Sequence, residues 1–147
     1  TVQIWLPAII AAALPVRADI RPVVVLVDDD VEVRDILADT LASYGCLVSA
    51  YANATSALAR IADNAPDLLI SDLSMPGTDG MTLIRQVRLL RPGLAAILLT
   101  GHSGRDLEEA VANLAGGRVL LVQKPARVAA LAAQINALLP DGVRLIA

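Results

Sequence analysis

The sequence predicts an α/β domain in which a parallel sheet carries helices on both faces. Five short runs rich in Val, Ile and Leu recur along the chain, and longer stretches with helical spacing follow them. The runs lack polar alternation, which is typical of strands buried on both faces, and regular alternation of strand and helix favours a parallel sheet. The expected strands are Val23–Val27, Leu47–Ala50, Leu68–Ser71, Ala95–Thr100 and Val119–Gln123.

The five stretches that follow these runs place apolar residues three or four positions apart, which predicts amphipathic helices. Their apolar stripes are Val33, Ile36, Leu37, Thr40 and Leu41; Ala57, Leu58, Ile61 and Ala62; Leu83, Ile84, Val87 and Leu90; Leu107, Val111 and Leu114; and Val128, Leu131, Ile135 and Leu138. Asn53 is placed to cap the second helix, and Pro66 resists its continuation. Pro92-Gly93 ends the third helix, and a tight segment after Leu114 predicts a short fourth helix.

The composition fits one compact domain and excludes some functions. Of 147 residues, 56% are hydrophobic and 2% aromatic, with no Phe, so Val, Leu, Ile and Ala must form the core. The net charge of -3 and the absence of a basic run give no support to nucleic-acid binding. The single Cys46 cannot form an internal disulfide, which fits a reducing, cytoplasmic location, and we interpret it as a buried apolar residue.

The first sixteen residues carry no charge, so a targeting or membrane segment must be considered. The stretch has no basic start, as a signal peptide requires. It is also shorter than a bilayer span and is interrupted by Pro7 and Pro15. We therefore expect no membrane segment in this chain, and we interpret the chain as a fragment of a longer protein. The domain should cover residues 23–140, followed by a C-terminal tail at 141–147.

Polar side chains stand where four of the expected strands end. They are Asp28, Asp29 and Asp30 after the first strand, Asp72 after the third, Thr100 at the fourth and Lys124 after the fifth. Carboxyl ends of parallel strands meet at one edge of the sheet, where such folds bind ligands. The clustered carboxylates would repel one another unless a hard cation such as Mg²⁺ lay between them.

These residues together suit phosphoryl transfer. Attack of the Asp72 carboxylate on phosphorus gives an acyl phosphate, and Lys124 and Thr100 can stabilise the phosphoryl oxygens. Each feature alone has a simpler interpretation: an Asp run begins a helix, Asp72 forms a turn, Thr100 caps a helix and Lys124 lies in a solvated loop. The combination is far more specific than any of its parts. Lys124 is, moreover, the only Lys beside eleven Arg.

Four motifs carry a resemblance to a known family. They are Val25-Leu26-Val27-Asp28-Asp29-Asp30, Asp72-Leu73-Ser74-Met75-Pro76-Gly77-Thr78-Asp79-Gly80, Leu98-Leu99-Thr100-Gly101 and Gln123-Lys124-Pro125. In residue types and spacing, residues 23–139 resemble the receiver domains of response regulators. The resemblance implies a flavodoxin-like fold of five parallel strands in the order 2-1-3-4-5.

The resemblance also implies a role for each matching residue. Asp72 corresponds to the phosphoacceptor, and Mg²⁺ would be held by Asp72, by Asp29 directly, by Asp28 often through water, and by the backbone carbonyl of Ser74. Thr100 corresponds to the hydroxyl that moves toward the phosphoryl group. Lys124 corresponds to the lysine that pairs with it, before a cis peptide bond to Pro125. Asp30 is expected only to begin the first helix.

Two positions depart from the family pattern. An aromatic residue that switches together with the threonine is common three positions before the lysine, where this chain has Leu121. The apolar, often aromatic, residue that commonly follows Lys-Pro is Ala126 here. Two alternatives to an aromatic switch stay open: Leu121 changes rotamer in its place, or the output surface works differently. Ala129, Ala130, Ala133 and Ala137 extend the apolar surface of the last helix and suggest docking, although Ala is also simply a good helix former.

The expected function is that of a phosphorelay receiver, which takes a phosphoryl group from a histidine kinase or a histidine phosphotransfer domain and loses it slowly. It is a phosphoacceptor rather than a turnover enzyme, and a receiver–receiver dimer is a further expectation. The alternatives are a degenerate receiver that only binds proteins, a haloacid-dehalogenase-type phosphatase and a flavodoxin. The phosphatase would need a second acid near Asp72, where Leu73-Ser74 stand, and the flavodoxin needs a phosphate-binding loop.

A second, shorter resemblance lies at the start of the chain. Residues 1–7, Thr-Val-Gln-Ile-Trp-Leu-Pro, resemble the last strand of the ATP-binding domain of sensor histidine kinases. The resemblance implies a hybrid histidine kinase as the parent protein, with residues 8–22 as the linker to the receiver. An arbitrary hydrophobic tail or an edge strand of the same domain is the alternative.

Overall fold

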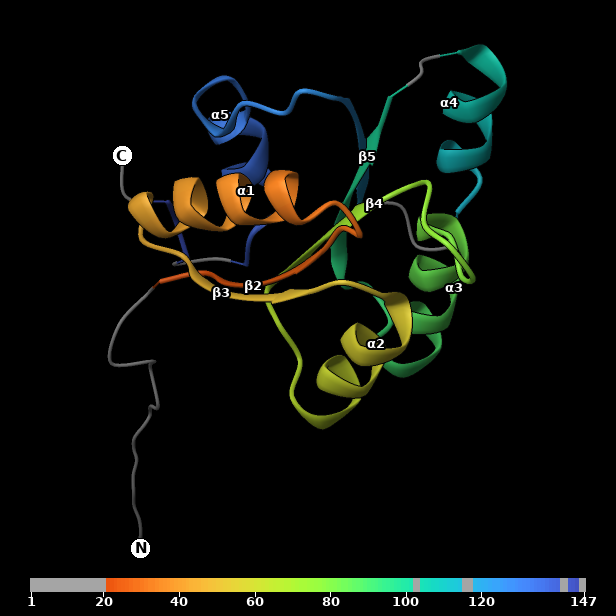
Figure 1. Cartoon of the computed structure of the whole chain (residues 1–147), viewed down its shortest axis with the longest axis horizontal. Helices are drawn as coiled ribbons and strands as arrows, with labels where there is room; N and C mark the ends of the chain where they lie inside the picture. The colour runs from red at the N-terminus through yellow and green to blue at the C-terminus, as the bar shows by residue number, and fades with distance from the viewer. Residues whose placement is uncertain (1–20, 102–103, 115–117, 141–142, 146–147) are drawn as a thin grey trace, which may run out of the picture.

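The computed structural model describes residues 21–101, 104–114, 118–140 and 143–145. Within these ranges five strands alternate with five helices (Figure 1). The strands are β2 (Val23–Val27), β3 (Leu47–Tyr51), β4 (Leu68–Asp72), β5 (Ala95–Thr100) and β6 (Val119–Gln123). The helices are α1 (Val31–Ser43), α2 (Ala54–Asp63), α3 (Gly80–Leu90), α4 (Arg105–Ala112) and α5 (Val128–Leu138). Every expected strand is found, and each end lies within one residue of its predicted position.

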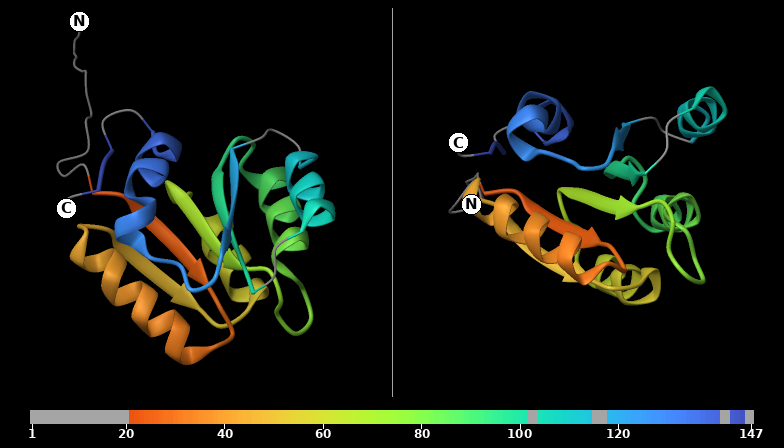
Figure 2. Two further views of the ribbon diagram at one scale, coloured as in Figure 1. Left: turned by 90° about the horizontal axis from the view of Figure 1, so that it is seen from above. Right: turned by 45° about the horizontal axis from the view of Figure 1, so that its top comes forward.

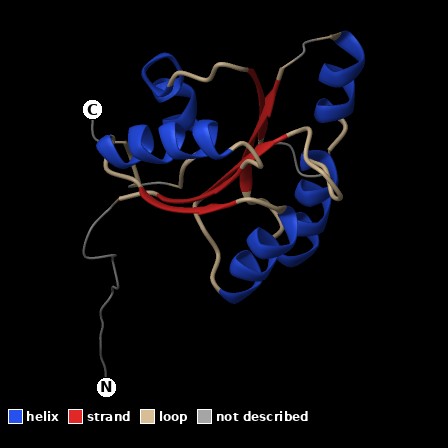
Figure 3. Ribbon diagram, in the orientation of Figure 1, coloured by secondary structure: helices blue, strands red, loops and turns tan. Residues whose placement is uncertain are grey.

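The five strands form one parallel sheet in the order β3-β2-β4-β5-β6, which is the predicted 2-1-3-4-5 order along the chain. Figure 3 shows the strands in red between the helices. The register pairs Val27 with Ser71, and Asp72 with Leu99. The last residues of β2, β4 and β5 therefore stand beside one another. This alignment brings the residues that follow those strands to one edge of the sheet.

Helices cover both faces of the sheet, as predicted. The three views agree that α1 and α5 lie on one face and that α2, α3 and α4 lie on the other (Figures 1 and 2). Each face has its own core of buried aliphatic residues, one that includes Leu26, Leu37 and Ile97 and one that includes Val27, Ile61 and Leu83. The central strands β4 and β5 are buried along their whole length, whereas β6 is only partly covered.

The helix starts show why the polar residues before them are needed. The first backbone N–H groups of a helix lack internal partners, and side chains satisfy them here. Asp30 accepts hydrogen bonds from the N–H groups of Glu32 and Val33 before α1, so its expected role is confirmed. Asn53 caps α2 as predicted, and Asp79 caps α3 in the same way.

Three residues of the predicted apolar stripes are exposed: Ile36, Ala62 and Leu90. Ile36 of α1 is 66% exposed and Leu90 of α3 is 46% exposed, whereas their stripe neighbours Leu37 and Val87 are buried. An apolar stripe has residues along its centre and at its margins, and the sheet covers only the centre. The residues at the margins therefore remain exposed. The expectation of burial was wrong at these three positions.

The remaining helices and the chain beyond α5 complete the domain. α4 spans only eight residues, in agreement with the prediction of a short helix. After α5, Val143 is buried in the core beside α1 and α5, and the N–H of Leu145 donates to the Asn136 side chain at 2.9 Å. Among the helices in the described ranges, none combines the length and apolar character needed to cross a membrane.

Candidate functional site

The first acidic residue after β2 is wholly enclosed. Asp28 has no exposed surface, and each of its carboxylate oxygens has a partner. Oδ1 accepts the N–H of Asp30 at 2.9 Å, and Oδ2 accepts a hydrogen bond from Nζ of Lys124 at 3.1 Å. The Arg34 guanidinium holds the Asp28 backbone carbonyl at 2.8 Å. Asp28 is therefore fixed in position, whereas the neighbouring Asp29 is exposed.

Asp72 is the last residue of β4 and is almost completely buried, with 6% of its surface exposed. Its Oδ1 lies 3.2 Å from Nζ of Lys124, and the backbone N–H of Ser74 donates to its carboxylate. Burial raises the pKa of Asp72 above its ordinary value, and the charge of Asp28 raises it further. Lys124 and the Ser74 N–H act in the opposite direction, without cancelling the rise.

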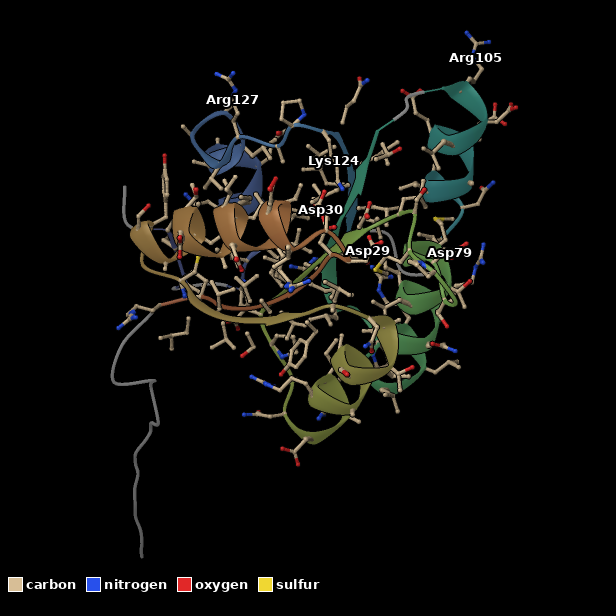
Figure 4. All side chains as sticks on the ribbon, in the orientation of Figure 1. Asp29, Asp30, Asp79, Arg105, Lys124 and Arg127 are labelled. Carbon is tan, nitrogen blue, oxygen red and sulfur yellow. The ribbon has the colours of Figure 1, made fainter. Side chains whose placement is uncertain are left out.

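Lys124 joins the two buried carboxylates. Its ammonium group forms ion pairs with both Asp28 and Asp72, while a quarter of its side chain (25%) stays exposed. Burial alone would lower the pKa of Lys124, but the hydrogen bonds and charges of Asp28 and Asp72 outweigh burial and raise it. The Lys124-Pro125 peptide bond is cis, as the family resemblance implied. Figure 4 shows Lys124 reaching from the end of β6 toward the edge where Asp29 lies.

The other two predicted site residues lie at the same edge. Thr100 is the last residue of β5 and is 3% exposed; its carbonyl accepts the N–H of Lys124 at 2.7 Å. Ser74 lies in the loop between β4 and α3 and is exposed. Four strands and one loop thus bring the residues proposed from the strand ends to one edge of the sheet.

The carboxylates are arranged as a cation site. One oxygen each from Asp28, Asp29 and Asp72 lies within 4.8 Å of the others. In the part of the chain that the structure describes, Lys124 is the cation that forms ion pairs with this group. Three carboxylates are therefore balanced by one positive charge. Hard oxygen donors with an excess of negative charge suit Mg²⁺, which binds to a few carboxylates and retains waters. The donor set therefore fits the metal expected from the sequence.

Comparison with known families agrees with this geometry. The sequence profile of the response regulator receiver domain matches residues 24–136, which is most of the chain. The chain belongs to the response regulator receiver family. The fold and the acidic pocket with its lysine are accordingly those of a receiver of two-component signalling, as the sequence analysis expected.

Individual relatives give the same result. The receiver is 38% identical over 105 residues to the DNA-binding transcriptional regulator NtrC of Salmonella typhimurium, a match that covers 71% of this chain and 22% of NtrC. It is 40% identical over 104 residues to the C4-dicarboxylate transport regulatory protein DctD of Rhizobium meliloti, with the same coverage of 71% and 22%. The chain thus spans about a fifth of the length of these curated relatives.

Two solved receiver structures match over nearly their whole length. A putative response regulator from Chloroflexus aurantiacus is 31% identical, with a TM-score of 0.72, and the match covers 80% of the receiver and 97% of that chain. A CheY-like receiver domain protein from Methanospirillum hungatei is 27% identical with a TM-score of 0.72, and the match covers 80% and 92%.

The receiver departs from the family pattern where the sequence indicated. Leu121 on β6 is half-buried and packs against the core beside α2, α3 and α4. Ala126 packs on the opposite core, near α5. Both positions hold small or aliphatic groups, so the structure contains no aromatic ring where receivers commonly carry their switch residue.

Sequence reasoning did not single out three residues that surround the receiver pocket. Arg34 holds the carbonyl of Asp28, the hydroxyl of Ser71 donates to the carbonyl of Asp72, and Gly80 packs against the same carbonyl. Ser71 was the one residue with a detectable signal, because it is the single polar residue within the apolar part of its strand. Arg34 and Gly80 depend on tertiary contacts that no local pattern reveals.

Beside the pocket, the receiver has an apolar groove that sequence analysis did not predict. The groove, of about 310 Å³, lies between α1 and the loop after β6, and its lining includes Ile36, Pro125 and the stem of Lys124. Val31, also on α1, is 53% exposed. Exposed apolar side chains gathered beside a functional site are typical of protein contact surfaces.

Cys46 conforms to the expectation of a buried apolar residue. It is 3% exposed in the core beside α1 and α5. Burial raises the pKa of its thiol to about 11, and Arg21 acts weakly in the other direction. The thiol is therefore protonated at neutral pH and has little nucleophilic character.

Proposed function

We propose that this receiver accepts a phosphoryl group on Asp72 from a phosphohistidine, with Mg²⁺ bound by Asp28, Asp29, Asp72 and the backbone carbonyl of Ser74. The observation that carries the proposal is the contact of Lys124 with both Asp28 and Asp72 in a buried pocket that has an excess of negative charge. A degenerate receiver that only binds proteins is disfavoured, since the carboxylates of Asp28, Asp29 and Asp72 lie together with the ammonium of Lys124.

The residues of the pocket supply the steps of the transfer. An oxygen of Asp72 forms a bond to phosphorus while the phosphorus–nitrogen bond of the phosphohistidine breaks, and the electron pair stays on the imidazole nitrogen. Lys124 then pairs with the phosphoryl oxygens, and the Thr100 hydroxyl donates to them. Bound Mg²⁺ supplies charge neutralisation for the same oxygens. Slow attack of water on the acyl phosphate returns the carboxylate and ends the signal.

A labelling experiment tests this function directly. The full chain, treated with acetyl phosphate or phosphoramidate and Mg²⁺, should gain the mass of one phosphoryl group in intact-mass spectrometry. Removal of Mg²⁺ with EDTA should prevent the gain, because the carboxylates then repel the incoming phosphoryl group. A chain whose mass stays unchanged with donor and Mg²⁺ would favour the binding-only alternative.

The two acidic residues after β2 should contribute unequally to metal binding. Both oxygens of Asp28 already accept hydrogen bonds, whereas the Asp29 side chain is exposed at the pocket. Asp29→Ala should therefore abolish Mg²⁺ binding in calorimetry. Asp28→Ala should weaken binding about 10- to 100-fold, as expected for a group that orients ligands or binds through water.

The helix cap Asp30 offers a matched control for that comparison. Asp30→Ala removes a third carboxylate from the same acidic run, but Asp30 accepts N–H groups at the start of α1 instead of facing the other two. Its Mg²⁺ affinity should equal that of the wild-type protein. Indistinguishable affinities of Asp28→Ala and Asp29→Ala would refute the assigned order.

The proposed phospho-donor is a histidine kinase or a histidine phosphotransfer domain. The apolar groove beside Lys124, with Ile36 at its margin, supports a donor that docks as a protein surface. A second surface supports a receiver–receiver dimer: Ala129, Ala130, Ala133 and Ala137 of α5 are all exposed. The two surfaces lie on different helices, so they can be tested separately.

A charge placed on either surface should have a different effect. Ile36→Glu should slow transfer from a phosphohistidine donor about tenfold or more by placing a charge at an apolar contact, and leave labelling by acetyl phosphate unchanged. Ala130→Glu should weaken self-association in sedimentation and leave both reactions unchanged. Each variant serves as the control for the other. Normal transfer to Ile36→Glu would exclude the groove, and a monomer before and after phosphorylation would exclude the α5 surface.

The parent protein is also a proposal. The hybrid histidine kinase is supported only by the resemblance of residues 1–7, which, like most of the proposed linker 8–22, lie outside the described residues. The curated relatives NtrC and DctD are transcriptional regulators in which the matched part is about a fifth of the length. The coding sequence upstream of Thr1 separates the two architectures. Cytoplasmic location, the expected setting of a kinase-coupled receiver, remains part of the proposal.

A further inference from the structure

The backbone carbonyl of Asp72 has an unusual hydrogen-bond partner. Ser71 precedes it on β4 and is completely buried, and its hydroxyl donates to that carbonyl at 2.9 Å. A buried hydroxyl in an apolar strand is costly unless it is hydrogen-bonded. Here its bond goes to the peptide group that carries the candidate phosphoacceptor, instead of to a neighbouring strand.

The first residue of α3 packs against the same carbonyl. A methyl group added at Gly80 would overlap the carbonyl oxygen of Asp72 and stand 2.6 Å from Cδ1 of Leu98. The N–H of Gly80 donates to the carbonyl of Leu73 at 2.9 Å. Glycine is needed here because of this close approach. The first residue of α3 thus contacts the carbonyl groups of both Asp72 and Leu73.

The position of α3 is itself fixed. Asp79 accepts the N–H of Thr82 at 2.8 Å, so the helix begins at a defined residue. Behind Gly80, Leu83, Ile84 and Val87 are buried in the core on this face of the sheet. A helix anchored in this way cannot shift to accommodate a larger residue at position 80 without disturbing Asp72 or the core.

We propose that Ser71 and Gly80 are positioning residues that set the direction of the Asp72 carboxylate. Both contact the carbonyl of the peptide group after Asp72, and that group fixes the backbone from which the carboxylate extends toward Lys124, 3.2 Å away. A displacement of about 1 Å at a reacting group can cost on the order of 100-fold in rate. This inference rests on the proposed phosphorylation of Asp72, whose backbone Ser71 and Gly80 hold in place.

The test compares variants of the full chain. Ser71→Ala removes the hydroxyl, and Ser71→Thr restores it. Ile97→Val is the matched control, because it weakens the buried core of the neighbouring strand on the face beside α1 and α5. For each variant, the maximal rate of labelling at saturating acetyl phosphate and Mg²⁺ is measured, together with the half-saturating donor concentration. The ¹³C NMR shift of the Asp72 carboxyl carbon is recorded without metal.

We expect the maximal rate of Ser71→Ala to fall about tenfold, with an unchanged half-saturating concentration and a shifted Asp72 carboxyl signal. Ser71→Thr should recover most of the rate, and Ile97→Val should change neither quantity. Gly80→Ala should have a larger effect in the same direction; if it does not fold, the Ser71 variants decide. A wild-type rate in Ser71→Ala, an equal loss in Ile97→Val, or no recovery in Ser71→Thr would overturn the inference. Absence of labelling in the wild type would instead refute the proposed function.

Discussion

Asp72→Asn is expected to abolish phosphoryl incorporation completely. The amide cannot act as the nucleophile, and Asp28 and Asp29 do not replace Asp72 in this role: Asp28 is held by Lys124 and the Asp30 N–H, and Asp29 belongs to the metal group. Intact-mass spectrometry with acetyl phosphate and Mg²⁺ should show one added phosphoryl group in the wild type and none in the variant. Equal labelling of both proteins would show that another residue is the acceptor.

This loss should not result from unfolding. The pKa of Asp72 is raised in the folded protein, mainly by burial, so its ionised form is disfavoured by the fold. In metal-free buffer the contribution of Asp72 to stability therefore falls as the pH rises from its ordinary pKa of 3.8 through the raised value. The neutral amide avoids this penalty, and Asp72→Asn should be at least as stable as the wild type at pH 7.

Asp79→Asn provides the matched control. It makes the same change from carboxylate to amide at an exposed residue, at the far end of the loop that follows Asp72. Asn is as good a helix cap as Asp, so α3 should begin unchanged. Its labelling should equal that of the wild type. A loss of labelling in Asp79→Asn would mean that amide substitution in this loop disturbs the pocket indirectly.

Lys124→Met should have the largest effect on stability. Without the ammonium, the buried carboxylates of Asp28 and Asp72 lose the cation with which both are paired. Removing one partner of a fully buried ion pair costs about 3–5 kcal/mol. Because Lys124 is 25% exposed, solvent screening reduces this figure, and we expect a loss of about 2 kcal/mol in metal-free denaturant unfolding. Labelling should also be strongly reduced, since Lys124 pairs with the phosphoryl oxygens in the proposed reaction.

The pH dependence of that loss has a definite direction. The pKa of Lys124 is raised in the folded protein. Its contribution to the free energy of unfolding is therefore complete below the ordinary pKa of 10.5 and is lost as the pH rises through the raised value. Toward acid, protonation of Asp72 removes one partner of the ion pair. The deficit of Lys124→Met should therefore be greatest near neutral pH and smaller at both extremes.

Two comparisons separate this effect from a general loss of positive charge. Arg127 is an exposed cation just past the cis-proline, so Arg127→Met should change stability by no more than about 0.5 kcal/mol. Mg²⁺ should reduce the deficit of Lys124→Met, because a bound cation replaces the missing charge and stabilises the folded state that binds it. If Lys124→Met is as stable as Arg127→Met without metal, the ion pairs contribute nothing to stability.

The fold was predictable because several independent signals agree. Runs such as Val24–Val27 are apolar throughout, as is typical of strands covered on both faces, and each run predicted as a strand proved to be one. The turn and cap residues Asn53 and Pro66 marked helix ends by local chemistry that does not depend on tertiary context. Helix margins were less predictable: the periodicity of α1 does not reveal that no other element covers Ile36.

The site was predictable as a set of residues, though not in its contacts. Topology alone brings Asp72, Thr100 and Lys124 to one sheet edge, since each stands where a parallel strand ends. Which oxygen of Asp28 meets Lys124 depends on side-chain rotamers, and the packing of Gly80 on the Asp72 carbonyl depends on how closely α3 approaches β4. Such distances follow from the packing of the whole core, which a linear pattern does not contain.

The ion pair between Lys124 and Asp28 joins residues 96 positions apart, which has a consequence for protein synthesis. Domains fold as units, and the chain emerges from the ribosome at about 5–20 residues per second. A nascent chain that has emerged only as far as β5 contains Asp72 and its acidic neighbours, but the ammonium of Lys124 that pairs with them is still to be made. The pocket is therefore complete only after β6 and the residue that follows it have emerged. Under the proposed function, a chain that ends before Lys124 lacks one of the groups that would pair with the phosphoryl oxygens.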